Sequence, residues 1–193
     1  MSKYYIRRMA LEEIKALYKR IERDFARGEY SPFAILEEHL ENGLQKAYVF
    51  CEEEEDLAYA VCTDTHDNGY VLISLLAVFK EYRGQGVGSA FLERLRLMYK
   101  DKQALLVEVE RPDEAKTPEE AHSRRRRIEF YVKAGFYLIE GVDYSIWDIP
   151  MHLMAFPLIA SKKTINQEIK GSMYELYLSL MGEELIHKMQ VSG

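Results

Sequence analysis

Two spacings of apolar residues run along the chain, and together they predict a protein built of both strands and helices. Short apolar segments predict strands at 4–9, 47–52, 57–63, 70–78, 104–110, 136–139, 144–147 and 151–157. The segment Tyr70–Val78 is almost continuously apolar, which is typical of a strand buried on both faces. The acidic run at 52–56 separates two of the strands and predicts a solvent-exposed hairpin turn.

Apolar residues at intervals of three and four predict helices at about 11–27, 32–43, 87–98, 118–134 and 165–180. Ser31 is expected to cap the second of them, with Pro32 at its first helical position. Thr117-Pro118-Glu119-Glu120 is a capping box that predicts the start of the fourth helix. Gly135 is expected to end that helix in the left-handed conformation.

Two of the helices carry further expectations about packing. The third should bury one face, made of Val87, Phe91, Leu95 and Met98. The last is interrupted by two glycines, and its apolar residues are Ile165, Ile169, Met173, Leu176, Tyr177 and Leu180. Its pattern fits two alternatives equally well: a helix packed on its own domain, or a homodimer contact.

Length and composition indicate one ordinary globular domain. The chain has 193 residues and shows neither repeats nor a linker, so we expect a single domain, with a core at about 1–158 and a helical extension at about 164–190. The formal net charge of −6 argues against a nucleic-acid partner and suits a cationic substrate. Cys51 and Cys62 lie in apolar segments and are expected to be small buried residues, and no metal is expected.

The sequence also bears on where the protein works. Its first residues lack the apolar core of a signal peptide, and its longest apolar run is too short to span a bilayer. We therefore expect a cytoplasmic protein without a membrane partner.

The most specific motif is a glycine-rich segment between a predicted strand and a predicted helix. Gly84, Gly86 and Gly88 alternate with larger residues, so the backbone can turn tightly and approach a ligand closely. The helix that follows has no capping side chain, and its first amide groups are therefore available to an anion. Arg83 adds a positive charge beside them. This segment predicts a phosphate-binding loop.

Two familiar phosphate motifs do not fit this loop. A P-loop ends in Gly-Lys-Ser/Thr, whereas this one continues as Gly88-Ser89-Ala90. A dinucleotide fingerprint needs glycine or alanine at the position of Ser89 and follows its strand directly, whereas a charged stretch intervenes at 80–83.

The pattern Arg83-x-x-Gly86-x-Gly88 resembles the acetyl-CoA motif of the GNAT superfamily of N-acetyltransferases. A second block, Phe130-Tyr131-Val132-Lys133-Ala134-Gly135-Phe136, is similar to the end of a later helix in that family. The resemblance is clear over 70–136 and extends to 4–156. It implies an α/β fold with a mixed, mostly antiparallel sheet of six to seven strands, flanked by helices, and here an extra C-terminal helix.

The resemblance also implies a cofactor and the residues that hold it. The cofactor is acetyl-CoA, whose pyrophosphate would bind the backbone of the glycine loop. The backbone at the end of the buried strand would pair with the pantetheine arm as an added strand would. The expected cofactor-binding residues are Ala77, Val78, Arg83, Gly84, Gln85, Gly86, Val87, Gly88 and Ser89.

Two residues are candidates for the chemistry. Tyr131 occupies the family's tyrosine position, and its phenol is protonated at neutral pH, so it is the candidate general acid for the departing thiolate. A tyrosine on an amphipathic helix is otherwise a packed aromatic residue. Glu108 and Glu110 project to one face of a strand, and Glu108 is the candidate general base. An exposed carboxylate, or an ion pair with Arg111, is at least as good an interpretation of Glu108.

The chain departs from the family pattern in the run Arg124-Arg125-Arg126-Arg127. Family members often have asparagine at the position of Arg124. Arg125 and Arg126 are expected to be solvated, whereas a contact of Arg124 or Arg127 with a CoA phosphate stays open.

The acceptor is the least defined part of the prediction. The first two helices, the turn at 63–69 and the loop at 141–150 are expected to line the substrate pocket, together with aromatic residues. Candidates for its wall are Tyr30, Phe33, Tyr144 and Trp147. The resemblance implies transfer of an acetyl group to a primary amine of a small molecule or peptide. One alternative is a non-catalytic module that binds an acyl-CoA and regulates a partner. Another is an acyltransferase for longer acyl chains, which the glycine loop does not distinguish from an acetyltransferase.

Overall fold

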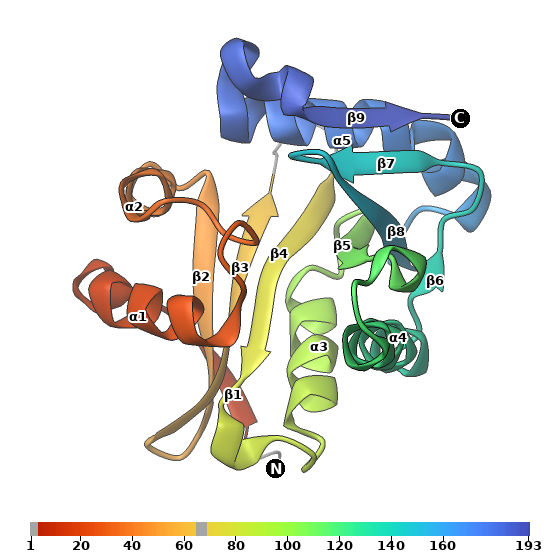
Figure 1. The fold of residues 1–193 in the computed structure, drawn as a ribbon. Coiled ribbons are helices and arrows are strands. Elements are labelled where there is room, and N and C mark those ends of the chain that lie inside the picture. The colour runs from red at the N-terminus through yellow and green to blue at the C-terminus, as the bar shows by residue number, and fades with distance from the viewer. Residues whose placement is uncertain (1–3, 65–68) are drawn as a thin grey trace. The chain divides into compact units, whose positions relative to one another are not determined.

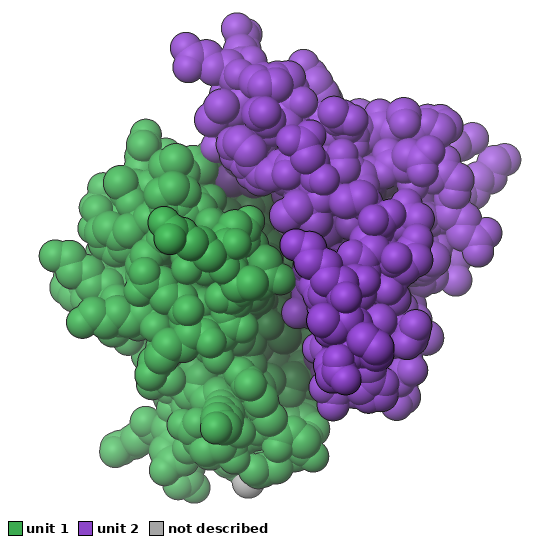
Figure 2. Space-filling model, viewed as in Figure 1, with its two compact units in different colours: residues 1–64, 73–95 green, residues 65–72, 96–193 purple. Residues whose placement is uncertain are grey.

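The computed structural model describes residues 4–64 and 69–193. Residues 65–68 make up most of the turn expected beside the substrate, and this part of the prediction lies outside the described residues. The chain forms two compact units, one of residues 1–64 and 73–95 and one of residues 65–72 and 96–193 (Figure 2). The boundary passes through a strand rather than between 158 and 164, and the expectation of a single domain stays a prediction.

The first unit is a sheet with helices on both faces (Figure 1). Its strands, in spatial order, are β1 (Tyr4–Arg8), β2 (Gln45–Glu52), β3 (Glu55–Asp64) and the later part of β4 (Tyr70–Val78), with β1–β2 and β2–β3 antiparallel. Its helices are the short η1 (Leu11–Glu13) and η2 (Lys80–Tyr82), then α1 (Ile14–Asp24), α2 (Phe33–Glu41) and most of α3 (Val87–Met98). Apolar residues of α1 and α2 pack on one face of the sheet, whereas Phe91 of α3 stacks on Phe50 of β2, with 4.9 Å between ring centroids.

The second unit begins with the first residues of β4. Tyr70–Leu72 pair in parallel with β5 (Ala104–Glu110), which is antiparallel to β8 (Ile149–Pro157). Antiparallel pairing then adds β6 (Tyr137–Leu138), β7 (Asp143–Ile146) and β9 (Met189–Ser192). The helices of this unit are η3 (Pro112–Glu114), α4 (Pro118–Lys133), α5 (Lys162–Leu185) and η4 (Ile186–Lys188).

This architecture confirms the predicted fold class, a mixed and mostly antiparallel sheet with flanking helices and a C-terminal helix. The described residues form nine strands rather than the six to seven that the resemblance implies. Eight of them overlap the predicted strand segments, and the ninth, β9, follows the C-terminal helix. Both cysteines are buried and neither forms a disulfide. Among the residues described, no helix combines the length and the apolar character that crossing a membrane requires.

Most local signals are confirmed. β4 and β5 have the predicted bounds, and the side-chain oxygen of Thr117 accepts a hydrogen bond of 3.1 Å from the amide of Glu120 at the start of α4. Gly135 ends α4 with a φ of +94°. The expected place of Pro32 inside α2 is wrong. Pro32 has extended backbone and precedes the helix, and its carbonyl accepts hydrogen bonds from the amides of Ile35 and Leu36.

Two predictions about helix faces are resolved by burial. Val87, Phe91 and Leu95 are buried, but Met98 is 41% exposed, because it is the last residue of α3 and Tyr99 takes the buried position beside it. In α5, the predicted apolar stripe is buried in the core of the second unit with Tyr70, Leu72 and Leu106, except for its last residue, Leu180, which is partly buried. The helix therefore packs on its own chain, and the homodimer contact stays a prediction.

Candidate functional site

The glycine loop follows η2 and leads directly into α3. Gly84 and Gly86 have φ angles of +76° and +80°, in the left-handed region that residues with side chains rarely adopt. A side chain added at either position would meet nothing within 4 Å, so backbone conformation rather than crowding requires glycine there. The sequence pattern predicted this turn because the constraint is local.

The amide groups of this loop are the main chemical feature of the first unit. One backbone hydrogen bond lies on each side of the loop. The Arg83 amide donates to the Lys80 carbonyl, and the Ala90 amide donates to the Gly86 carbonyl. Within the described residues, the backbone N–H groups of 84–89 make no hydrogen bond of ordinary geometry, whereas the side-chain amide of Gln85 donates to the Glu81 carbonyl at 2.9 Å. They stand at the N-terminus of the twelve-residue helix α3, where the helix dipole favours negative charge. Such a row of donors can bind the oxygens of a phosphate.

Arg83 fixes the loop to the rest of the first unit. Its Nε donates to the Val78 carbonyl at 2.8 Å, and its Nη2 pairs with Asp24 of α1, also at 2.8 Å. These contacts tie the start of the loop to the end of β4 and to α1. The expected contact of Arg83 with a phosphate stays a prediction.

The edge of β4 is the second feature that bears on a cofactor. Pairing of β4 with β5 is confined to three residue pairs, the last of which is Leu72 with Leu106. Beyond Leu72, β4 therefore has no β5 partner in the described part of the chain. Ala77 lies on this later part of the strand, and the expected pairing of its backbone with an extended ligand stays a prediction. The carbonyl oxygen of Val78 accepts the hydrogen bond from Nε of Arg83.

In the second unit, Glu108 of β5 lies at the centre of a polar cluster. Its carboxylate accepts hydrogen bonds from the hydroxyl of Tyr144 on β7 and from the hydroxyl of Tyr177 on α5, the latter at 2.8 and 2.9 Å from the two oxygens. Protein atoms surround the carboxyl group densely, although the residue keeps some accessible surface. This burial raises the pKa of Glu108, and the two tyrosine hydrogen bonds oppose the rise.

The structure thus excludes two interpretations of Glu108. It is neither an exposed edge carboxylate nor the partner of Arg111, which pairs with Asp113 at 2.7 Å. The sequence analysis missed both tyrosines as its partners. A signal was present for Tyr177, because a hydroxyl within the apolar stripe of a helix needs a hydrogen-bond partner when it is buried.

Tyr131 is buried on α4 among other aromatic residues. Its ring lies 5.1 Å from that of Phe130 and 5.3 Å from that of Phe136, both edge to face. Only 7% of the residue is exposed, so α4 and the following turn hold its ring in a fixed orientation. Its role as general acid stays a prediction.

Sequence and structure comparisons relate this chain to a known family of enzymes. Residues 44–138, which include the glycine loop, β4, β5 and α4, match the sequence model described as the acetyltransferase (GNAT) domain. The chain carries a GNAT-family acetyltransferase domain. The search of curated proteins gives no match to this sequence.

Solved structures agree in fold. A protein from Bacteroides thetaiotaomicron assigned to the GNAT family is 22% identical with a TM-score of 0.73, covering 92% of this chain and 98% of its own. The ribosomal-protein-S18-alanine N-acetyltransferase of Escherichia coli is 19% identical with a TM-score of 0.57, and the match covers 82% of this chain and 97% of that one. A Bacillus subtilis acetyltransferase in complex with CoA is 16% identical with a TM-score of 0.60, and the match covers 81% of this chain and 100% of that one.

The four arginines at 124–127 of the GNAT domain have different surroundings. Arg125 and Arg126 are exposed, which confirms their prediction. Arg124 is buried, and its guanidinium donates to the Arg111 carbonyl and pairs with Glu110 and Glu120 at 2.9 and 2.6 Å. Arg124 therefore holds α4 against β5 within the second unit.

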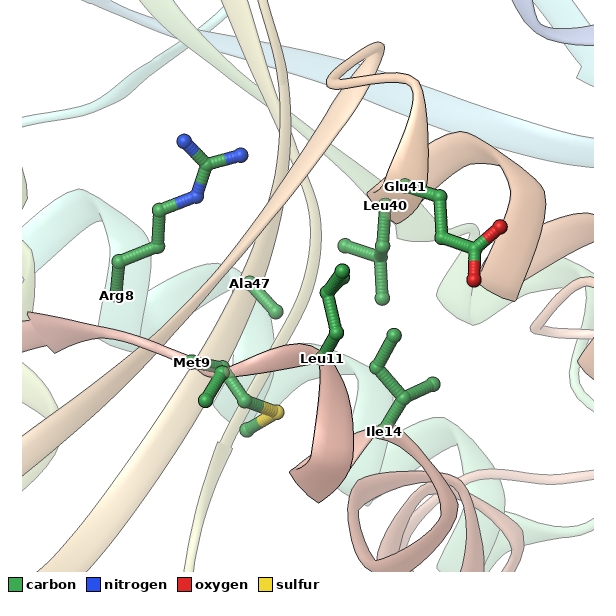
Figure 3. Close-up of a pocket in the computed structure, with 8 residues that line it drawn as sticks. Arg8, Met9, Leu11, Ile14, Leu40, Glu41 and Ala47 are labelled. Atoms are coloured by element: carbon green, nitrogen blue, oxygen red, sulfur yellow. The ribbon is translucent and has the colours of Figure 1, made fainter.

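A pocket of about 280 Å³ lies in the first unit beside α1 and α2 (Figure 3). Six of its eight lining residues are apolar, and the two charged ones are Arg8 and Glu41. None of its lining residues belongs to the glycine loop or to β4.

The four aromatic residues expected to line the substrate pocket have different surroundings. Tyr30 and Phe33 pack edge to face on Tyr18, and none of these three lines the pocket beside α1 and α2. Tyr144 is buried against Glu108, whereas Trp147 is 47% exposed. Their contact with a substrate stays a prediction.

Proposed function

We propose that this protein transfers the acetyl group of acetyl-CoA to a primary amine of a small molecule or peptide, by direct attack of the amine on the thioester. The observation that carries the proposal is the row of backbone N–H groups at 84–89, which make no hydrogen bond of ordinary geometry to the described chain and stand at the N-terminus of α3. The GNAT domain and the CoA complex of a structural neighbour support acetyl-CoA as the ligand.

The first unit would hold the cofactor through its backbone. The loop amides would bind the pyrophosphate, while β4 beyond Leu72 would pair with the pantetheine arm. Arg83 would contribute by fixing the loop to β4 and α1, because its side chain is already paired there.

Two residues of the second unit would move protons. An amine must be neutral to attack a thioester, and Glu108 would accept the proton that the amine loses, directly or through water. Burial raises the pKa of Glu108, which makes its carboxylate a stronger base than an exposed one. Tyr131 would donate its phenolic proton to the thiolate as the carbon–sulphur bond breaks.

The test is a transfer assay on the full chain. Acetyl-CoA would be incubated with a polyamine, an arylamine, a lysine side chain in a peptide and a peptide with a free N-terminus. Free CoA thiol and the mass of each product would be measured. We expect one class to gain a single acetyl group for each CoA released. Binding of acetyl-CoA without acetylation of any class would favour the regulatory acyl-CoA-binding module instead.

A further inference from the structure

Three elements of the second unit meet at the Glu108 carboxylate. β5 supplies Glu108 itself, β7 supplies the hydroxyl of Tyr144, and α5 supplies the hydroxyl of Tyr177. Tyr144 and Tyr177 are both buried, at 4% and 9% exposure. The two tyrosines lie outside the segment 44–138 that matches the family, so the cluster is a feature of this chain rather than of the matched segment.

In the part of the chain that the structure describes, no charged side chain acts on the Glu108 carboxylate. On β8, the residue paired with Glu108 is Leu153, and its neighbour His152 interacts with Arg111 and Asp113 instead. The charged residues of α4 that reach β5 bind Glu110 rather than Glu108. Among the described residues of β4, β7, β8, α4 and α5, the titratable groups that act on Glu108 are therefore the phenols of Tyr144 and Tyr177.

We propose that Tyr144 and Tyr177 are positioning residues for Glu108, and that the C-terminal helix α5 is thereby part of the catalytic machinery. This inference rests on the proposed function, in which Glu108 accepts the proton of the amine.

The geometry explains how the two phenols would act. Tyr177 shares its hydroxyl proton between both carboxylate oxygens, while Tyr144 donates to Oε1. Together they fix the plane of the carboxylate and leave Oε2 with the greater capacity to accept a further proton. Both donate to the ionised form, so they favour it, whereas burial disfavours it. Losing either hydroxyl would therefore raise the pKa of Glu108.

The experiment is the pH dependence of kcat/KM in the full chain, with Tyr177→Phe and Tyr144→Phe as test variants. A hydrogen bond to a charged group is worth about one to two pKa units, so the acidic limb should move up by about one to two pH units in each variant. Tyr70→Phe is the matched control. It removes a hydroxyl of β4 that donates to Glu168 of α5 at 2.7 Å, a tyrosine–glutamate contact to the same helix away from Glu108.

A purely structural role for the tyrosines would lower stability in all three variants and leave the acidic limb unmoved, which would overturn the proposal. Melting temperatures of the three variants would be measured alongside. If Tyr177→Phe does not fold, Tyr144→Phe carries the same test.

A second readout separates this proposal from the proposed function. Carboxyl carbon NMR of the full chain without substrates would follow Glu108 directly, with its signal assigned by Glu108→Gln. We expect the Glu108 titration to move to higher pH in Tyr177→Phe and to stay in place in Tyr70→Phe. The NMR titration of Glu108 could move in Tyr177→Phe while the acidic limb of kcat/KM persists in Glu108→Gln. That combination would show that the tyrosines position Glu108 but that Glu108 is not the base. An unmoved titration would overturn the proposal.

Discussion

Among single residues, Tyr131 gives the sharpest test of the chemistry. If its phenol protonates the thiolate, Tyr131→Phe should lower kcat at least about 100-fold, because positioned proton transfer contributes that much or more. The ring would still pack between Phe130 and Phe136, so acetyl-CoA affinity should hold. Steady-state kinetics and a binding titration on one preparation would measure both.

Tyr99→Phe serves as the control for this prediction. Tyr99 follows α3 and is buried to the same degree, with 6% exposed against 7% for Tyr131. The control variant also loses a buried hydroxyl but should keep its kcat. Equal rates for Tyr131→Phe and the unchanged protein would remove Tyr131 from the mechanism.

Residue-level features were predictable where their cause is local. The positive φ of Gly84 and Gly86 follows from the spacing of glycines before a helix, which the sequence shows directly. The partners of charged residues were not predictable in this way. Arg83 pairs with Asp24, 59 residues away, and Glu108 binds Tyr177, 69 residues away. Only the fold brings these groups together.

At the level of elements, α5 packs its apolar stripe into the core of the second unit. Met173 of this stripe has 0% of its surface exposed, so Met173→Ala should cost about 2–5 kcal/mol of the free energy of unfolding, through lost burial and the cavity left behind. Urea denaturation would measure the change.

The adjacent residue supplies the control for this helix. Tyr174 is 48% exposed on the same turn, so Tyr174→Ala should stay within about 0.5 kcal/mol of the unchanged protein. A small cost for Met173→Ala, equal to that of Tyr174→Ala, would mean that α5 does not pack on its own chain in solution.

Element boundaries followed from the sequence where apolar runs and caps are strong. β4, β5 and the start of α4 are of this kind. The sequence analysis placed the start of α2 one residue too early. In Ser31-Pro32, either residue can be the last one before the helix, and the structure has Pro32 there. β9 was missed because a strand of four residues has little pattern of its own. Its identity comes from pairing with β7.

For the whole molecule, the two glycines Gly86 and Gly43 allow a direct test of the cofactor site. Both belong to the first unit, both have a φ of +80°, and an added side chain at either would meet nothing within 4 Å. Valine at the two positions therefore imposes the same backbone strain. Only Gly86 lies in the loop that would hold the pyrophosphate.

The measurement that tests the central claim is calorimetric titration of acetyl-CoA into the unchanged protein, Gly86→Val and Gly43→Val, with the alanine pair in reserve if the valine variants do not fold. We expect the unchanged protein and Gly43→Val to bind alike. Gly86→Val should lose at least about 100-fold in affinity, the equivalent of two lost hydrogen bonds to a charged group. Unchanged affinity in Gly86→Val, or no binding by the unchanged protein, would contradict the assignment of acetyl-CoA to the glycine loop.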